Sequence, residues 1–165
     1  MTDYKKYIRE GKGRSDLTGL FANPEILNSA IEDMAKPFLD QKINKVVALD
    51  ALGFIFGTRI AEKLNVGLVL VRKSGKIGVK TKSISFTDYT KTEKSFEIAV
   101  DAIKPNDKVL IVDDWSETGS QLKATITLVE SIEGNVIGVS CFNIDKPVFN
   151  DSVLSKYKLY SALKD

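Results

Sequence analysis

Short apolar runs of strand length alternate along this chain with segments in which apolar residues recur at helical spacing. Runs of the first kind predict β-strands, and segments of the second kind predict helices with one buried face. Strands are predicted at 45–50, 67–72, 79–86, 95–100, 108–112 and 136–144, and helices at 23–40, 54–64 and 118–132. Strands that alternate with helices favour an α/β fold, in which a mainly parallel sheet is flanked by helices on both faces.

The predicted helices are placed by their ends and by their apolar faces. Asn23 is expected to cap the first helix, and Pro24 to take its first position, where a missing N–H is harmless. The buried face of this helix is expected to contain Leu27, Ala30, Ile31, Met34 and Phe38. The corresponding faces of the other two helices are Ile55, Ile60, Ala61 and Leu64, and Leu122, Ile126, Val129 and Ile132.

Composition limits the function more than the fold. The 165 residues, 43% of them hydrophobic, supply enough apolar surface for one core, so 1–165 is predicted to form a single domain. With 24 basic and 22 acidic residues the net charge is +2, which argues against nucleic acid or a membrane as a partner. Histidine is absent, so Ser–His and Cys–His catalysis are excluded. A single cysteine, Cys141, excludes an internal disulfide, and the start of the chain has no apolar stretch typical of a secretory signal, so a cytoplasmic location is expected.

The segment 108–121 has the residue types that a phosphorylated sugar requires. A buried-type strand leads to Asp113 and Asp114, and after a short turn Thr118-Gly119-Ser120 opens a helix. The N-terminus of a helix offers unpaired N–H groups and a partial positive charge to a phosphate. The two carboxylates are suited to accept hydrogen bonds from ribose hydroxyls. Alternatively, the aspartates are a polar strand end and Thr118 is an N-cap.

The whole segment from Val109 to Gln121 resembles the diphosphate-ribose signature of the type I phosphoribosyltransferases. The similarity runs from about Asp16 to Leu163 and is greatest to the adenine branch of that family. This resemblance implies a Rossmann-like, mainly parallel twisted sheet with a flexible loop over the site. It also implies binding of 5-phosphoribosyl-1-diphosphate (PRPP), with Mg²⁺ held through the ligand and water rather than by a dedicated set of protein ligands.

The resemblance assigns a part of PRPP to each of three segments. Asp113 and Asp114 would bind the ribose, and the turn after them the 5-phosphate. The diphosphate would be held by a turn similar to the family's diphosphate loop and by a basic turn after the predicted strand 67–72. The turn that would bind the 5-phosphate comprises Glu117, Thr118, Gly119, Ser120 and Gln121, preceded by Trp115 and Ser116. The residues assigned to the diphosphate are Ala51, Leu52, Gly53, Arg72, Lys73 and Lys76.

Departures from the family pattern cluster where the diphosphate and the base are bound. Leu52 replaces an arginine that is usual in the diphosphate loop. In the N-terminal base-recognition segment, 1–22, Ser15 stands where an arginine is expected, and Arg14 lies one place earlier. Trp115 and Gln121 also differ from the adenine pattern, and Trp115 is interpreted either as a base-stacking residue or as packing against the sheet.

Two acids are candidates for the catalytic proton carrier. Asp88, followed by Tyr89 in a polar stretch at 87–94, is similar to the acid of the family's mobile loop. Glu117 stands where the hypoxanthine-guanine branch has a catalytic aspartate.

The reaction expected from the resemblance is transfer of the phosphoribosyl group from PRPP to adenine, with AMP and diphosphate as products. Such an enzyme is a pentosyltransferase of purine salvage, and its relatives are commonly homodimers. The departures keep two alternatives open: a phosphoribosyltransferase for hypoxanthine, guanine or another base, and a regulator that senses PRPP without catalysis.

Overall fold

A computed structural model describes residues 2–11, 15–88 and 90–164, and within them seven strands form one sheet in the order β5-β6-β4-β3-β7-β8-β9. The strands β4, β3, β7, β8 and β9 are parallel, whereas β6 pairs antiparallel with both β4 and β5. The prediction of a mainly parallel sheet is therefore confirmed. The strands are β3 (Lys45–Leu49), β4 (Gly67–Lys73), β5 (Thr81–Thr87), β6 (Glu93–Ala99), β7 (Lys108–Ser116), β8 (Asn135–Ile144) and β9 (Lys158–Ser161).

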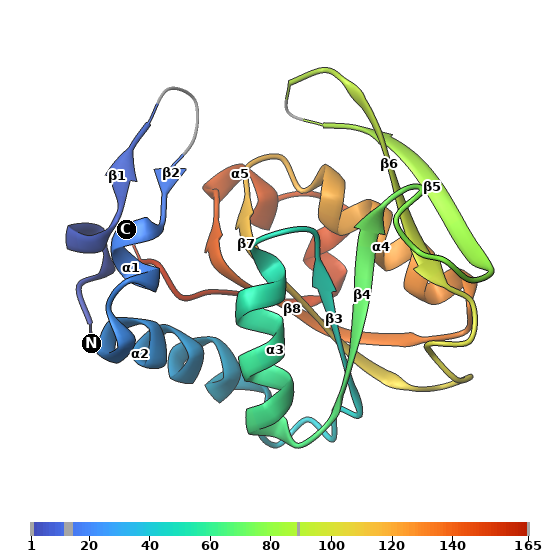
Figure 1. The fold of residues 1–165 in the computed structure, drawn as a ribbon, viewed down its shortest axis with the longest axis horizontal. Coiled ribbons are helices and arrows are strands. Elements are labelled where there is room, and N and C mark those ends of the chain that lie inside the picture. Colours follow the sequence, from blue (N-terminus) through green and yellow to red (C-terminus); the bar gives the residue numbers. More distant parts are fainter. Residues whose placement is uncertain (1, 12–14, 89, 165) are drawn as a thin grey trace.

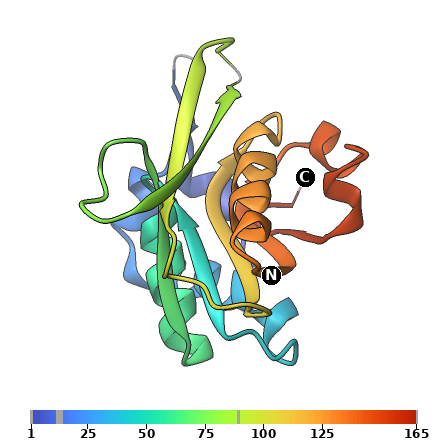
Figure 2. The ribbon, with the colours of Figure 1, turned by 90° about the vertical axis from the view of Figure 1, so that its right-hand side faces the viewer.

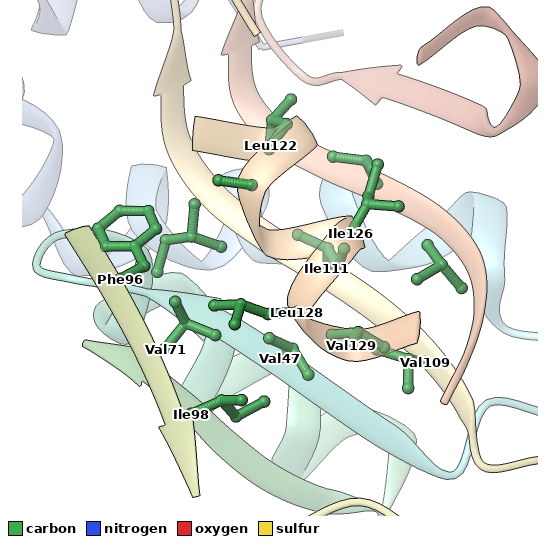
Figure 3. Packing of buried hydrophobic residues seen from close by; sticks show 14 of the residues in the cluster. Val47, Val71, Phe96, Ile98, Val109, Ile111, Leu122, Ile126, Leu128 and Val129 are labelled. Carbon is green, nitrogen blue, oxygen red and sulfur yellow. The ribbon is translucent and has the colours of Figure 1, made fainter. Parts of the chain in front are cut away.

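Helices cover both faces of this sheet, as predicted. The helices α2 (Pro24–Ala35) and α3 (Gly53–Leu64) share one core cluster with Val46 and Leu110. The helix α4 (Ser120–Ser131) shares another with Val47 and Ile111, the next residues along the same two strands. Figure 3 shows α4 lying across the strands with its apolar side chains turned toward them. Because successive residues of a strand point to opposite faces, the two clusters lie on opposite sides of the sheet.

The start of α2 follows the sequence closely. The Asn23 side chain accepts hydrogen bonds from the N–H groups of Glu25 and Ile26, each at 3.2 Å, and Pro24 is the first helical residue. The helix gives way to a 3-10 turn at Lys36–Phe38. Of the face predicted to be buried, Leu27 is half-buried and the remainder, Ala30, Ile31, Met34 and Phe38, is fully buried.

Besides the earlier end of α2, differences from the prediction are clear in three other elements and in one buried face. The strand β7 runs to Ser116 rather than stopping at Val112, because Asp113, Trp115 and Ser116 still pair with β8. The helix α4 begins at Ser120, since Gly119 has a left-handed backbone with φ of 74°. The strand β6 begins at Glu93, so strand pairing shortens the loop predicted at 87–94. In α3, Ile55 is 38% exposed, and Phe56 is buried in its place.

The two strand–helix–strand units of the sheet diverge from its centre. The strand β3 leads through α3 to β4 on one side, and the neighbouring β7 leads through α4 to β8 on the other. Ligands of such sheets bind beyond the carboxyl ends of the strands, where the connections part in this way. Here that point lies beyond Leu49 and Ser116.

Two hairpins stand at this edge of the sheet. One is formed by the short strands β1 (Arg9–Glu10) and β2 (Ser15–Asp16), and the other by β5 and β6. Figure 1 shows them rising on either side of the carboxyl ends of the central strands, and Figure 2 shows the β5–β6 hairpin extending beyond the sheet.

Short helical segments complete the chain. Before and after β1–β2 lie a 3-10 turn (Tyr4–Tyr7) and α1 (Thr18–Phe21), and between β8 and β9 lie α5 (Lys146–Phe149) and a 3-10 turn (Leu154–Lys156). In the parts of the chain that the structure describes, no helix combines the length and apolar character needed to cross a bilayer.

Candidate functional site

A cavity of about 580 Å³ opens at the carboxyl ends of β3 and β7. Its wall combines the turn after β3, the end of β7 with the turn that follows, the end of β4 and the β5–β6 hairpin, and Ser15 of the N-terminal hairpin also contributes. From the predicted site, the wall contains Ala51, Leu52, Lys73, Asp88, Asp114, Trp115, Glu117 and Gln121. Segments far apart in the sequence therefore meet at one place.

The turn after β3 presents an acid that was not predicted as a site residue. Asp50 lines the cavity together with Ala51 and Leu52, and the Asp50–Ala51 peptide bond is cis. Its carboxylate oxygens lie 3.5 Å from Nε of Arg72 and 3.9 Å from Nζ of Lys73. The sequence signal for Asp50 was an acid at the end of the predicted strand 45–50, the position at which parallel sheets place ligand contacts.

The carboxylates of β7 differ sharply in their surroundings. Asp114 is half-buried and lines the cavity, whereas Asp113 is 3% exposed and lies behind the wall. The N–H of Asp114 donates a hydrogen bond of 2.8 Å to Oδ1 of Asp113. Burial, reinforced by the neighbouring charges of Asp114 and Glu117, raises the pKa of Asp113 well above its ordinary value. Of the predicted pair, Asp114 is the one that reaches the cavity directly.

The loop that follows forms a small hollow beside the main cavity, lined by residues 115–121. It contains Ser116, Thr118, Gly119 and Ser120, the predicted site residues of this segment that the main cavity lacks. The hydroxyls of Thr118 and Ser120 lie 3.0 Å apart at the start of α4. A hydroxyl pair at the N-terminus of a helix of this length is suited to bind a phosphate.

A positive φ and close packing both require glycine at position 119. Its φ is 74°, and a Cβ there would lie 2.4 Å from Cδ1 of Leu154 and 3.3 Å from Cγ1 of Val148. These two side chains belong to the core cluster that packs α4 onto the sheet. The backbone of the hollow is thus supported from below by apolar packing.

The three cations of the basic turn are not equally placed. Lys73 lines the cavity. Arg72 is beside Asp50, and its NH1 group also donates to the carbonyl oxygen of Lys76 at 3.4 Å. The Lys76 side chain is exposed and does not line the cavity. Gly53, also predicted to contact the diphosphate, is buried at the start of α3 behind the wall.

The carboxylate of Asp88 is engaged within its own hairpin tip. Its Oδ1 accepts hydrogen bonds from the hydroxyl and N–H of Thr90, at 2.5 and 2.8 Å, and from the N–H of Thr92 at 3.2 Å. Nζ of Lys94 lies 4.0 Å from its Oδ2. The hydrogen bond from the Thr90 hydroxyl is the main cause that lowers the pKa of Asp88. The lowered pKa favours the ionised carboxylate, which cannot donate a proton. Tyr89, the predicted companion of Asp88, lies outside the described residues.

The N-terminal segment reaches the cavity through Ser15. Its neighbour Asp16 forms an ion pair of 2.8 Å with Arg9 and accepts hydrogen bonds from the N–H and hydroxyl of Thr18, at 2.9 and 2.6 Å. These contacts fix the entry to α1 beside the cavity. Arg14, which lies next to Ser15 in the predicted base-recognition segment, is outside the described residues.

The β5–β6 hairpin contributes most of the lining that sequence reasoning missed. Phe86, Glu93, Lys94, Ser95 and Phe96 line the cavity, and the rings of Phe86 and Phe96 pack with their centroids 4.7 Å apart. These residues carry no individual signal, because their place follows from the pairing of β6 with the end of β4 at Arg72 and Lys73. The partly exposed rings of Phe86 and Trp115 give the cavity an aromatic surface suited to a flat heterocycle, whereas Phe96 is 2% exposed and belongs to the core.

The donor atoms at the wall suit a hard cation. Asp50, Asp114 and Glu117 offer carboxylate oxygens, the ligand type that Mg²⁺ prefers. Within residues 2–11, 15–88 and 90–164, no group of three or more His, Cys, Asp or Glu side chains is arranged to hold a metal.

Comparison with known proteins gives consistent matches. The family described as phosphoribosyl transferase domain matches residues 17–154. The adenine phosphoribosyltransferase of Rhodopirellula baltica is 40% identical over 163 residues, covering 98% of this chain and 78% of that protein. The crystal structure of the enzyme of the same name from Rhodothermus marinus has a TM-score of 0.88 and 35% identity, covering 96% of this chain and 94% of that one. That of Saccharomyces cerevisiae, in complex with an imino-altritol bisphosphate and adenine, has a TM-score of 0.84 and 26% identity, covering 96% of both chains.

Proposed function

The chain belongs to the phosphoribosyl transferase family, and on that premise we propose that it transfers the phosphoribosyl group of PRPP to N9 of adenine, forming AMP and diphosphate. It is a pentosyltransferase of purine salvage. The observation that carries this function is the meeting of the Asp50–Leu52 turn and the Asp114–Gln121 segment at one cavity, in a chain 40% identical to an adenine enzyme over nearly its full length.

Three groups of residues each bind a different part of PRPP. The hydroxyls and N–H groups at the start of α4 bind the 5-phosphate, with Thr118, Gly119 and Ser120 closest to it. Asp114 binds the ribose hydroxyls, and the buried Asp113 supports it from behind. The backbone of 51–53 and the Lys73 ammonium hold the diphosphate, with Arg72 and Lys76 beside them.

Holding both ends of PRPP stabilises the reaction at the carbon between them. The bond from the anomeric carbon to the diphosphate breaks as N9 of adenine forms its bond to the same carbon, and the carbon passes through a cationic state. Fixed groups at the phosphate and diphosphate ends orient the donor and stabilise the charge that develops on the departing diphosphate. Bound Mg²⁺ would supply positive charge to the departing diphosphate, and Asp50 and Asp114 would offer it carboxylate oxygens.

Glu117 is the proton carrier in this proposal. Glu117 lines the cavity, as do its sequence neighbours Trp115 and Gln121, and the Trp115 ring offers a surface on which a base can stack. Asp88, the alternative, is held as an anion by Thr90 and Thr92 at the hairpin tip. A carboxylate that is already stabilised as an anion is a weaker base toward a purine N–H.

The β5–β6 hairpin forms the lid of the site. Asp88 and Thr90 near its tip line the cavity, on an antiparallel pair that extends beyond the sheet (Figure 2). Closure over bound substrates would exclude water while the cationic state forms, as loops of this kind do in other enzymes.

A homodimer in the cytoplasm completes the proposal. Exposed apolar side chains gather on α3 and β4, where Ile55, Leu68 and Leu70 are 37–38% exposed and suit a partner surface. The cytoplasmic location rests on the single cysteine, Cys141.

A screen of purine and pyrimidine bases with PRPP and Mg²⁺, read as diphosphate release, tests the function. Adenine is expected to give the highest kcat/KM. Preference for hypoxanthine or guanine would reassign the acceptor, and PRPP binding without turnover of any base would show a sensor instead of an enzyme.

A further inference from the structure

Glu97 is a buried acid that the proposed mechanism leaves without a role. It lies on β6, is 4% exposed, and does not line the cavity. Among the described residues, Asp113 is the other acid buried to this degree. Burying a carboxylate is unfavourable unless hydrogen bonds compensate for the lost water, so its partners indicate its purpose.

The partners of Glu97 belong to the turn that follows β4. Its Oε1 accepts hydrogen bonds from the N–H groups of Lys76 and Ile77, at 2.7 and 2.8 Å, and the hydroxyl of Thr81 lies 3.3 Å from Oε2. Burial raises the pKa of the Glu97 carboxyl, but the backbone N–H groups of the turn outweigh burial and leave the pKa below its ordinary value. Glu97 is therefore an anion that accepts hydrogen bonds from the backbone of the turn.

Apolar packing contributes little to the conformation of this turn. Residues 73–76 and 78–80 are exposed, and a Cβ added at Gly75 or at Gly78 would meet no atom within 4 Å. Ser74 is fixed to β6 by a backbone bond of 3.0 Å and a hydroxyl contact of 2.7 Å to Ser95. Beyond Ser74, the Glu97 carboxylate is the group that gathers the backbone N–H donors.

We propose that Glu97 is a positioning residue for the diphosphate of PRPP, because its carboxylate fixes the backbone of the turn at Lys76 and Ile77. The carbonyl oxygen of Lys76 in turn accepts a hydrogen bond from NH1 of Arg72, which keeps Arg72 beside Asp50 at the cavity. This inference rests on the proposed function, in which that turn receives the diphosphate. Glu97 touches neither substrate. It acts through the backbone of the turn, and hence on the donor rather than on adenine.

The same strand joins the turn to the lid. Along β6, Glu97 holds the turn, Ser95 is bonded to Ser74, and Lys94 lines the cavity near the hairpin tip. A change at Glu97 therefore alters the basic turn at one end of β6, while the other end of the same strand covers the site.

The test is the substitution Glu97→Gln, which keeps the size of the side chain but removes the charge. Loss of charge-assisted hydrogen bonds to the turn is expected to raise the KM for PRPP about 10-fold, with the KM for adenine unchanged. The Kd of Mg²⁺–diphosphate, measured by calorimetry, is expected to rise by a similar factor. Glu97→Asp, which restores the charge, is expected to recover part of both losses.

Glu130→Gln is the control for loss of an acid's charge, because Glu130 is an exposed acid of α4 whose carboxylate accepts a hydrogen bond from Tyr157 rather than from the turn. An unchanged KM for PRPP and an unchanged diphosphate affinity in folded Glu97→Gln would overturn the proposal. Equal rises in both KM values would overturn it as well, since they indicate a general structural role.

Two further measurements keep the outcome decisive. If Glu97→Gln does not fold, Thr81→Ala, which removes one hydrogen bond to the carboxylate, decides in its place: its KM for PRPP must rise without a change for adenine. If the wild-type protein forms no AMP, the proposed function fails, but the diphosphate affinities of wild type and Glu97→Gln still decide the role of Glu97.

Discussion

Gly53 and Asp113 approach each other so closely that a Cβ on Gly53 would lie 2.9 Å from Oδ1 of Asp113. The same atom would lie 3.1 Å from the carbonyl oxygen of Val112 and 3.2 Å from the α-carbon of Asp113. Glycine is thus required here by contact between α3 and β7, and its backbone has no positive φ. This contact brings the proposed diphosphate turn against the proposed ribose carboxylates.

Replacing Gly53 with alanine is expected to push the start of α3 away from β7. Overpacking of this kind typically lowers the free energy of unfolding by about 1–3 kcal/mol, and it should also raise the Kd for PRPP. Thermal denaturation and calorimetry measure the two effects. Gly78→Ala is the control, because a Cβ at Gly78 meets no atom within 4 Å. Equal stability of the two variants would show that α3 shifts to accommodate the added Cβ without lowering the free energy of unfolding.

Replacing Asp113 with asparagine is expected to stabilise the protein and weaken PRPP binding. The pKa of Asp113 is higher in the folded than in the unfolded chain, chiefly because of burial, so wild-type stability is lost as pH rises from the unfolded value of about 3.8 toward the folded one. Asparagine removes this loss. Its advantage in Tm should therefore be greater at pH 7 than at pH 4, and each 1 kcal/mol corresponds to roughly 2–4 °C.

Melting curves at the two pH values check this prediction, with PRPP affinity determined in parallel. A lower Tm for Asp113→Asn than for wild type at pH 7 would show that the charge of Asp113 is satisfied in the folded protein. An unchanged PRPP affinity would remove Asp113 from the ribose site.

The two candidate proton carriers are separated by single-turnover rates with adenine. Glu117→Gln is expected to slow the chemical step by about 10²- to 10⁴-fold, the usual contribution of general acid–base catalysis. Asp88→Asn should change it far less, because Asp88 is already engaged by Thr90 and Thr92. The reverse order of effects would assign the proton to the lid.

Restoring a cation in the diphosphate turn is expected to improve donor binding. Leu52 lines the cavity and is 39% exposed, so an arginine there has room to reach the diphosphate. Leu52→Arg should lower the KM for PRPP by about 5- to 10-fold through charge-assisted hydrogen bonds. Leu52→Ala serves as the control for loss of the leucine. A KM that falls equally in both variants would show that the leucine merely obstructs the site.

Local patterns predicted the elements of the fold well where the signal was itself local. The Asn23 cap is an example, because a side chain that bonds the N–H groups two and three residues ahead depends on nothing distant. The end of β7 was wrong because Trp115 and Ser116 remain in the strand through pairing with Asn143 and Ile144, which no local pattern reveals.

In the candidate site, too, the residues with a local sequence signal were predicted and those placed by distant pairing were not. The Asp113–Gln121 segment and the turn at Ala51–Gly53 were predicted from contiguous residues, and the structure places both at the sheet edge. Phe96 could not be predicted, since it reaches the cavity wall through the pairing of β6 with β4 at Lys73. Glu97 gave no signal either, because its hydrogen-bond partners lie some twenty residues earlier in the chain.

The most direct test is identification of the nucleotide formed from adenine, PRPP and Mg²⁺ by the purified protein. AMP is expected to accumulate in equal amount with diphosphate, and the double substitution Asp113→Asn with Asp114→Asn is expected to abolish most of it. Formation of no AMP by the wild-type protein, at concentrations of PRPP that calorimetry shows to be saturating, would contradict the proposed function.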